Sequence, residues 1–454
     1  MYRENYICQG GIIERRQENL MTAHNKPVST LPKSPTSVLI NLIALDCVIV
    51  AFILIRKIGI NLTTLYAVII CLLALAIPII VLEAIFLKPY RRVSAGLDFS
   101  IKHRWDLQRA VVKLLGFYFT IALVALVYWL FPEYHRDCYG NYWTFVKVIL
   151  PPLLIAAIPY FIIIDHFMLN PQDGYWDAGM VVLGQWSRID RKIFGQHLLG
   201  WLVKTFFLPL MFIGFFNNVE YLRKADFCEV LQTFDGFYNF VRHAFFTVDL
   251  LFVTVGYAVS VRLFDSHLRS TEPTILGWLV ALQCYEPFWW FSSNAYLKYL
   301  TDFTWKIWLS GHPIIYAIWG IAILLLLLIY VYATIPFGIR FSNLTNRGIL
   351  TNGPYRFCKH PAYVSKNLSW WLVSIPFLSQ GGILESLRLS LLLLCLNIIY
   401  FLRARTEERH LSSDPVYVEY AMVMNERSIF AWMGKLLPLL QFRPFGMFNL
   451  KDQN

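Results

Sequence analysis

Two polar stretches near the C-terminus hold the side chains that are best suited to chemistry. The first covers residues 346–365 and contains Tyr355, His360 and Tyr363. Proline is tolerated at the first position of a helix, so Pro361 indicates that a helix starts here and that the chain turns back toward an apolar segment. An imidazole and two phenols are thereby brought to one entrance, where they could bind and orient a polar ligand.

The second stretch contains Arg403, Glu407 and Glu408. Arg403 and Glu407 are four residues apart and share one face of a helix. The helix continues the last apolar run out of the bilayer, so a ligand could approach this arginine and the two carboxylates either from the lipid or from the cytosol. The same spacing is also typical of a surface ion pair worth only a few tenths of a kcal/mol, so that alternative stays open.

The composition indicates that these residues belong to a membrane protein. The chain has 454 residues, of which 57% are hydrophobic and only 15% are charged. Soluble domains carry about 25% charged residues, so the lipid bilayer is the expected solvent. The net charge of +11 does not indicate nucleic acid, because the basic residues cluster between long apolar runs. The 8 cysteines are scattered and never spaced CxxC, so they predict neither a disulfide scaffold nor a metal site.

Apolar runs predict an all-α polytopic membrane protein with about ten spans. A span needs roughly 20 apolar residues. Eight clear runs and a weaker pair meet or approach this length: 38–55, 64–87, 111–131, 145–165, 194–216, 237–261, 274–292 and 313–337, then 367–380 and 385–402. The last two are separated by a short link that begins with Gly381-Gly382, which predicts a tight helical hairpin with a short first arm.

The basic residues also predict the orientation. Lys and Arg are more frequent on the side that holds both chain ends, the 88–110 loop and the 338–366 loop. The excess of Lys and Arg marks the cytoplasmic side of a membrane. We therefore expect an integral protein of the bacterial inner membrane or the endoplasmic reticulum, with both termini and both polar stretches facing the cytoplasm.

Two acidic residues, Asp249 and Glu286, fall inside predicted spans. Ionisable groups inside a membrane are costly and by default indicate a functional site. Together with the polar run 265–273 they are predicted to line an internal cavity. An internal hydrogen-bonded network that holds two spans together explains them equally well.

The order of the C-terminal motifs resembles that of a known family. The chain reads Gly-Pro-Tyr-Arg, then Lys-His-Pro-Ala-Tyr, then a helical hairpin, then Arg-x-x-x-Glu-Glu-x-x-Leu followed by two tyrosines. This order is similar to that of the isoprenylcysteine carboxyl methyltransferase and phospholipid methyltransferase superfamily. The resemblance covers about residues 313–425, and these positions carry it: 353–356, 359–363, Arg403, Glu407, Glu408, Leu411, Tyr417 and Tyr420.

The resemblance implies a helical membrane enzyme that takes S-adenosylmethionine from the cytosol and a lipid or lipid-linked acceptor from the bilayer, without a metal. It implies Arg403 and Glu407 as catalytic residues. The cofactor would be held by residues of both motifs, namely Tyr355, His360, Pro361, Tyr363, Glu407 and Glu408. A sulfonium cation is stabilised by a carboxylate and by aromatic faces, which fits these residue types.

One departure from the family concerns the acceptor. Many relatives have a small residue after the tyrosine of the His-Pro-x-Tyr motif, whereas this chain continues Val-Ser and then Lys366-Asn367. A cation and an amide are thus expected at the mouth of the hairpin, where we predict that they contact the substrate together with Asp249 and Glu286.

The predicted organisation has four parts. Residues 1–37 form a cytoplasmic tail, 38–312 a seven-helix membrane module of unknown role, 313–425 the methyltransferase-like module, and 426–454 a second tail. The first module exceeds what a minimal methyltransferase of this type needs. It is therefore expected to bind the acceptor or to form an assembly surface.

Two other function classes stay open. Sterol reductases resemble this superfamily in their last four spans and bind NADPH at the equivalent place, but they usually carry His-x-Asn-Tyr, whereas this chain has His-Pro-Ala-Tyr at 360–363. A transporter or lipid-binding protein would explain ten spans with Asp249 and Glu286. Transporters typically show inverted repeats or paired broken spans, and neither is evident in this sequence.

Overall fold

The computed structural model of the protein describes residues 30–57, 62–100 and 105–444. Residues 1–29 and 445–454 of the two predicted tails lie outside these ranges, as do 101–104 of the basic loop. Within the described ranges eight helices are long and apolar enough to cross a membrane. They are α2 (Val38–Lys57), α3 (Thr64–Leu82, continued by a π-helical turn to Leu87), α4 (Leu107–Leu130), α5 (Gly140–Phe167), α7 (Arg191–Lys224), α9 (Phe234–Ala258), α13 (Pro313–Thr334) and α15 (Ile383–Leu411).

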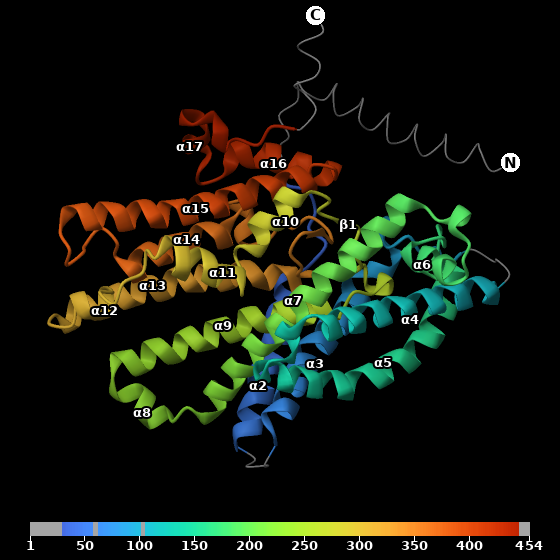
Figure 1. Ribbon diagram of the computed structural model, residues 1–454, viewed down its shortest axis with the longest axis horizontal. Coiled ribbons are helices and arrows are strands. Elements are labelled where there is room, and N and C mark those ends of the chain that lie inside the picture. The colour runs from blue at the N-terminus through green and yellow to red at the C-terminus, as the bar shows by residue number, and fades with distance from the viewer. Residues whose placement is uncertain (1–29, 58–61, 101–104, 445–454) are drawn as a thin grey trace, which may run out of the picture.

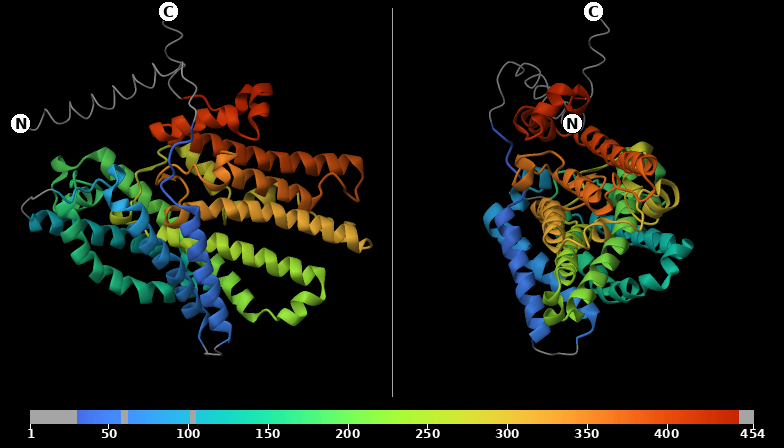
Figure 2. Two further views of the ribbon diagram at one scale, coloured as in Figure 1. Left: turned by 180° about the vertical axis from the view of Figure 1, so that it is seen from behind. Right: turned by 90° about the vertical axis from the view of Figure 1, so that its left-hand side faces the viewer.

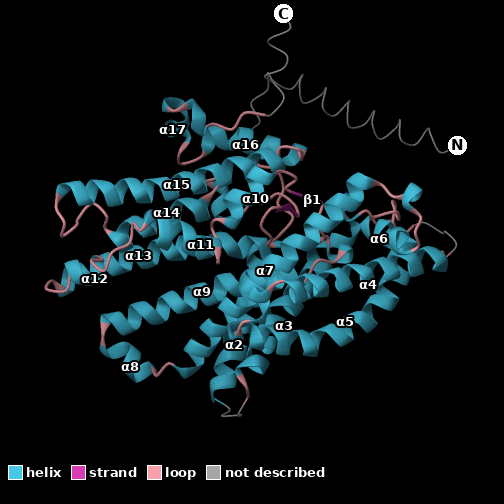
Figure 3. Cartoon of the chain, viewed as in Figure 1, coloured by secondary structure: helices cyan, strands magenta, loops and turns pink. Residues whose placement is uncertain are grey.

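The other elements are shorter and connect or flank these helices, as Figure 3 shows. They are α6 (Gly174–Val182), α8 (Phe227–Gln232), α10 (Ile275–Leu282), α11 (Phe288–Trp290), α12 (Trp305–Trp308), α14 (Pro361–Ser374), α16 (Pro415–Arg427) and α17 (Ala431–Leu436). Two short strands, β1 (Ser270–Thr271) and β2 (Thr345–Asn346), pair antiparallel.

Two of the ten predicted spans differ in the structure. The run 274–292 is broken into α10, α11 and a π-helical segment, Phe291–Leu297, because Pro287 has no N–H to continue a helical ladder. The first arm of the hairpin, predicted at 367–380, is α14, which begins at Pro361 and has 14 residues. A helix of that length covers about 21 Å, less than the ~30 Å of a bilayer core.

The helices form two groups at opposite ends of the molecule. Figures 1 and 2 show α13, α14 and α15 side by side at one end, with α16 and α17 beyond α15, and α4, α5 and α6 at the other end. The long helices α7 and α9 pack against each other between the groups. The β1–β2 pair joins the groups near the centre, with Ser270 opposite Asn346 and Thr271 opposite Thr345.

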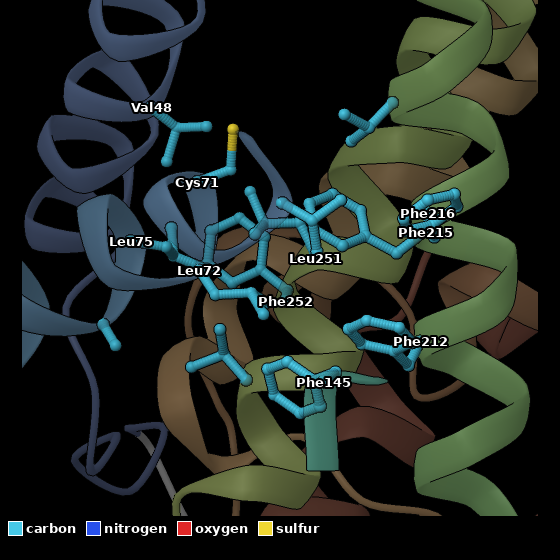
Figure 4. Packing of buried hydrophobic residues seen from close by; sticks show 14 of the residues in the cluster. Val48, Cys71, Leu72, Leu75, Phe145, Phe212, Phe215, Phe216, Leu251 and Phe252 are labelled. Atoms are coloured by element: carbon cyan, nitrogen blue, oxygen red, sulfur yellow. The ribbon is translucent and has the colours of Figure 1, made fainter. Parts of the chain in front are cut away.

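The largest apolar core joins the N-terminal helices to α7 and α9. In Figure 4 side chains of α3 meet aromatic rings of α5, α7 and α9. Phe145 and Phe212 stack with their ring centroids 4.5 Å apart. Lipid is as apolar as these side chains, so close packing rather than escape from water stabilises the contacts. The labelled members of this core are Val48, Cys71, Leu72, Leu75, Phe145, Phe212, Phe215, Phe216, Leu251 and Phe252.

A buried ion pair joins the end of α3 to the end of α13. Arg340 donates two hydrogen bonds to Glu83, at 2.9 and 2.8 Å, and both side chains are almost fully buried. Its other nitrogens donate to the carbonyls of Phe264 and Asp265. The Arg340 guanidinium therefore holds residues 264–265, which precede β1, against the segment that leads to β2. It thereby helps to position the loop that leads into the first C-terminal motif.

Helices α4 and α6 cross at two glycines. A Cβ on Gly179 would lie 2.1 Å from the Val112 carbonyl oxygen, and a Cβ on Gly116 would lie 1.9 Å from that of Tyr175. We expect Gly179→Ala to lower stability by about 1–3 kcal/mol, because backbone atoms must move apart. Thermal unfolding of the purified protein in detergent would measure the change.

The matched control is Gly195→Ala on α7, where a Cβ meets nothing within 4 Å. Alanine is preferred over glycine inside a helix by about 0.5–1 kcal/mol, so this variant should lose no stability. Equal unfolding temperatures for the two variants would contradict the proposed close approach of α4 and α6.

Candidate functional site

A cavity lies where the two C-terminal motifs meet. We call it the central cavity. Its wall comes from α10, α13, the loop 341–350, α14, α15 and α16. The predicted residues Tyr355, His360, Tyr363, Lys366, Arg403 and Glu407 all line it, together with Tyr285, Tyr330, Asn343, Tyr400, Tyr417 and Tyr420.

One hydrogen bond joins the two motifs directly. Tyr363, on the first turn of α14, donates its hydroxyl to Glu407 Oε2 on α15 at 2.7 Å. His360 precedes Pro361, the first residue of α14, and its ring lies parallel to that of Tyr363 with centroids 5.4 Å apart. The histidine, the tyrosine and the carboxylate therefore form one continuous wall of the central cavity.

Glu407 and Glu408 point to different sides of α15. The Glu408 carboxylate lies 2.7 Å from Lys359 Nζ, 3.2 Å from His360 Nε2 and 2.6 Å from an Arg405 nitrogen. Its side chain is 3% exposed and lines a second cavity rather than the central one. Glu408 therefore holds Lys359 and His360 in place, and only Glu407 faces the central cavity.

The second cavity, which we call the outer cavity, lies between α14, α15 and the C-terminal helices α16 and α17. The two cavities adjoin at four side chains that line both of them, Lys359, His360, Tyr363 and Tyr400. Its remaining wall is mostly apolar and includes Leu368, Trp371, Phe401, Met424, Phe430 and Met433. Such a lining suits a hydrocarbon chain.

Arg403 is buried and faces aromatic rings instead of a carboxylate. It donates to Asn343 Oδ1 at 2.7 Å and to the Tyr285 hydroxyl at 3.3 Å. The rings of Tyr285, Tyr363 and Tyr400 lie within 6.0 Å of its guanidinium carbon. No ion pair joins Arg403 to an acidic group in the described part of the chain. The alternative of a surface pair with Glu407 is therefore wrong.

Lys366 is another cation of the central cavity without a carboxylate partner in the described structure. Its Nζ lies between 5.4 and 5.6 Å from the ring centroids of Tyr330, Trp370 and Tyr400. No ion pair of Lys366 occurs within the described ranges. Cation–π contacts offset part of the lost hydration of both Lys366 and Arg403. An anionic group entering the cavity would offset more of it.

The acidic residues predicted inside spans have different surroundings. Asp249 is buried and accepts hydrogen bonds from Tyr330 at 2.8 Å and Thr334 at 2.5 Å. Those two side chains line the central cavity, and Asp249 lies behind them. Glu286 is exposed at the break between α10 and α11 and is not part of any of the cavities described here. Tyr285, its neighbour, is the residue that reaches the site.

Asn367 is directed away from Lys366, into the outer cavity. Its side-chain oxygen Oδ1 accepts a hydrogen bond from Asn397 Nδ2 at 2.5 Å, and Asn397 Oδ1 accepts one from Trp371 at 2.7 Å. Asn367 therefore links α14 to α15. The two predicted substrate contacts Lys366 and Asn367 serve two cavities, because neighbouring residues on a helix point about 100° apart.

Tyr355 closes the end of the central cavity that is near the C-terminal helices. Its hydroxyl donates to the Ala333 carbonyl at 3.1 Å, and its own carbonyl accepts from Tyr420 at 2.8 Å. Burial, and then the Glu407 carboxylate, raise the pKa of Tyr355 well above its usual range. Tyr355 is therefore a neutral phenol that holds α16 against α13.

Of the polar run 265–273, Glu272 is the residue that lines the central cavity. Glu272 lines the cavity and pairs with Arg409 of α15 at 3.0 Å. Ser270 of β1 contacts His410 of α15 at 2.9 Å. Asp265, by contrast, is fully buried away from the cavity and pairs with arginines. The sequence offered no signal for the Glu272–Arg409 pair, because the two residues are far apart in the chain.

Several polar atoms in the central cavity are available to a ligand. The hydroxyls of Tyr400 and Tyr417 are buried and have no hydrogen-bond partner in the described structure. Glu407 Oε2 accepts one hydrogen bond, and its other oxygen has no protein partner there. Buried polar groups normally have partners, so these atoms fit a polar, partly cationic molecule. In the part of the chain that the structure describes, no three His, Cys, Asp or Glu side chains could hold a metal ion.

Most of the central cavity is formed by a segment that matches a known protein family. No curated protein and no solved structure matches the chain. The two motifs, the hairpin between them and most of the residues that line the central cavity fall in one matched segment. Residues 314–413 match the Isoprenylcysteine carboxyl methyltransferase (ICMT) family, as the order of the motifs had indicated.

Proposed function

We propose that this protein is an integral membrane methyltransferase that uses S-adenosylmethionine and acts on a lipid or lipid-linked acceptor. The observation that carries the proposal is the hydrogen bond from Tyr363 to Glu407, which joins the two motifs at the wall of one cavity inside the matched segment. The eight long apolar helices support the membrane setting.

The cofactor would lie against the α14–α15 wall of the central cavity. When bound, it supplies an electrophilic methyl group on a sulfonium sulfur. Glu407 and the Tyr363 ring stabilise positive charge there, and Tyr355 and Tyr417 enclose the same end of the cavity. Pro361 sets the start of α14. Glu408 acts through Lys359 and His360 and is therefore a positioning residue.

The acceptor would present an anionic group to Arg403 and Lys366. Arg403 is buried and Lys366 is half-buried, and both line the cavity without a carboxylate partner among the described residues. Burying a cation without a counter-charge is costly, and a carboxylate acceptor would provide that charge. Transfer to a carboxylate needs positioning but no base. For an amine or hydroxyl acceptor, Glu407 would accept the proton.

The hydrocarbon part of the acceptor would occupy the outer cavity. Its apolar wall and its position behind Tyr363 and Tyr400 support this assignment. Asn367 would contact the substrate there rather than beside Lys366. Asp249 would contribute indirectly, since it fixes the hydroxyl of Tyr330 at the cavity wall.

Ligand titration of the purified full-length protein tests the cofactor. We expect S-adenosylhomocysteine to bind and NADPH not to bind. Glu407→Gln removes the carboxylate and should raise the dissociation constant at least about tenfold, and His360→Ala and Glu408→Ala should also weaken binding. The matched control is Glu385→Gln on the same helix, whose partner is the exposed Arg388.

Two results would contradict the proposal. Binding of NADPH but not of S-adenosylhomocysteine would favour a sterol-reductase-like enzyme. Binding that is unchanged in His360→Ala, Glu407→Gln and Glu408→Ala would show that the cofactor lies elsewhere. The acceptor is tested separately, by mass spectrometry of lipids from cells with and without the protein, in which the product should gain the mass of one methylene group.

A further inference from the structure

A separate polar cavity lies among the N-terminal helices. It is enclosed by α4, α5, α6, α7 and the segment 260–271. It shares no lining residue with the central cavity. The β1 strand lines it with Ser270 and Thr271, and the next residue, Glu272, belongs to the central cavity.

The acidic residues of this polar cavity are already paired. Asp165 lies 2.8 Å from an Arg109 nitrogen and 2.9 Å from Lys113 Nζ. Asp173 lies 3.5 Å from the same Lys113 nitrogen and caps the start of α6. Both carboxylates that line the cavity thus already have cationic partners, and Arg109 also pairs with Asp106 at 3.2 Å.

Three further cations line the cavity without a carboxylate partner. Lys192, Lys204 and Arg262 form no ion pair with any residue of the described ranges. Lys204 lies within the long apolar helix α7 and its Nζ is 4.7 Å from the centroid of the Trp201 ring. Arg262 donates to the carbonyl of Ala95 at 3.2 Å. The cavity therefore has an excess of positive charge, and Lys204 lies at a depth along α7 where an unpaired charge is costly.

Buried hydrogen-bonding atoms of the same wall also lack partners. They are Ser260 Oγ, His267 Nδ1 and Arg269 Nε, which find no partner in the described structure. Burial and then Arg262 and Arg269 lower the pKa of His267 well below its usual range, so its ring is neutral. A neutral imidazole can still donate one hydrogen bond.

We propose that this polar cavity binds a phosphate group, carried either by a lipid headgroup or by a soluble phosphate. Lys204, Arg262 and Lys192 would supply the positive charge, and Ser260 and Arg269 would donate hydrogen bonds. A carboxylate has two oxygens, whereas a phosphate has three or four and can use this larger set of donors. The proposal does not depend on the methyltransferase activity.

The depth of the cations along α7 supports the lipid as the source. Lys192 lies on the first turn of α7 and is exposed, and Lys204 lies three turns further along the same helix. A phosphate between them would lie just below the start of a membrane-spanning helix. That is the level of the headgroups if the start of α7 faces the cytoplasm, as its basic residues predict.

The test uses the full-length protein in neutral detergent, with dioctanoyl phosphatidic acid and sodium phosphate as separate probes in calorimetric titrations. The variants are Lys204→Met and Arg262→Gln. The matched control is Lys224→Met, the same substitution on the same helix at a lysine whose side chain is 75% exposed. Thermal unfolding in detergent shows which variants are folded.

We expect the dissociation constant of the phosphate probe to rise at least tenfold in Lys204→Met and in Arg262→Gln. In the control Lys224→Met it should stay within threefold of the value for the native protein. This pattern with phosphatidic acid alone supports a lipid headgroup, and the same pattern with sodium phosphate supports a soluble source. The proposal is overturned if neither probe binds the native protein. It is equally overturned if both folded variants bind as the native protein does.

Discussion

Arg403→Met is expected to reduce methyl transfer by at least about a hundredfold while the affinity for S-adenosylhomocysteine changes less than about threefold. Arg403 is buried against Tyr285 and Asn343 and has no carboxylate partner in the described structure. We assign it to the acceptor, so its loss should affect orientation of the substrate more than binding of the cofactor. Transfer of a labelled methyl group to extracted lipids measures the rate.

Two variants make this prediction specific. Arg403→Lys keeps the charge but loses the planar guanidinium that lies against the rings of Tyr285 and Tyr363, so we expect partial activity. Arg388→Met is the control, since Arg388 is on the same helix with its side chain 57% exposed. If Arg403→Met loses cofactor affinity in proportion to its rate, the arginine holds the cofactor and our assignment to the acceptor is wrong.

Arg340→Met is expected to destabilise the protein by about 3–5 kcal/mol, the usual cost of leaving one charge of a buried pair without its partner. Glu83 is 1% exposed, and the described structure offers it no other cation within 4 Å. The substitution also leaves the carbonyls of Phe264 and Asp265 without donors. Thermal or denaturant unfolding in detergent measures the loss.

The double variant Glu83→Gln with Arg340→Met should be more stable than Arg340→Met alone, because no uncompensated carboxylate then remains buried. Lys306→Met provides the comparison with an exposed pair: Lys306 and Asp235 are 2.6 Å apart with side chains 35% and 51% exposed. Exposed pairs contribute about 0–1 kcal/mol. A similar loss for Lys306→Met and Arg340→Met would contradict the role of the Glu83–Arg340 pair.

Most of the fold was predictable from the sequence because the thickness of the bilayer sets the length of each membrane-spanning helix. Eight of the apolar runs correspond to long helices, since a span needs a continuous hydrogen-bonded helix of roughly 20 apolar residues. The two runs that differ, 274–292 and 367–380, contain or adjoin local breaks. Pro287 interrupts the first, and the second starts earlier than predicted because Pro361 begins α14.

The candidate site was partly predictable for a similar reason. A helix start at Pro361 and the four-residue spacing of Arg403 and Glu407 are local properties, and the motif order predicted that these segments belong together. The structure brings Tyr363 and Glu407 into direct contact. The motif alone could not show that Glu407 and Glu408 serve different cavities, because that depends on which neighbours surround α15.

The sequence alone indicated that the chain is an assembly of apolar helices and that most of the candidate site residues lie in two C-terminal motifs. Both conclusions follow from the amino-acid composition and from the 3.6-residue repeat of the α-helix. Only the tertiary structure decided the partners of these side chains: Arg403 meets Asn343 and Tyr285, Asp249 lies behind Tyr330, and Glu286 is left at the surface. Such contacts join residues tens to more than a hundred positions apart, and no local spacing encodes them.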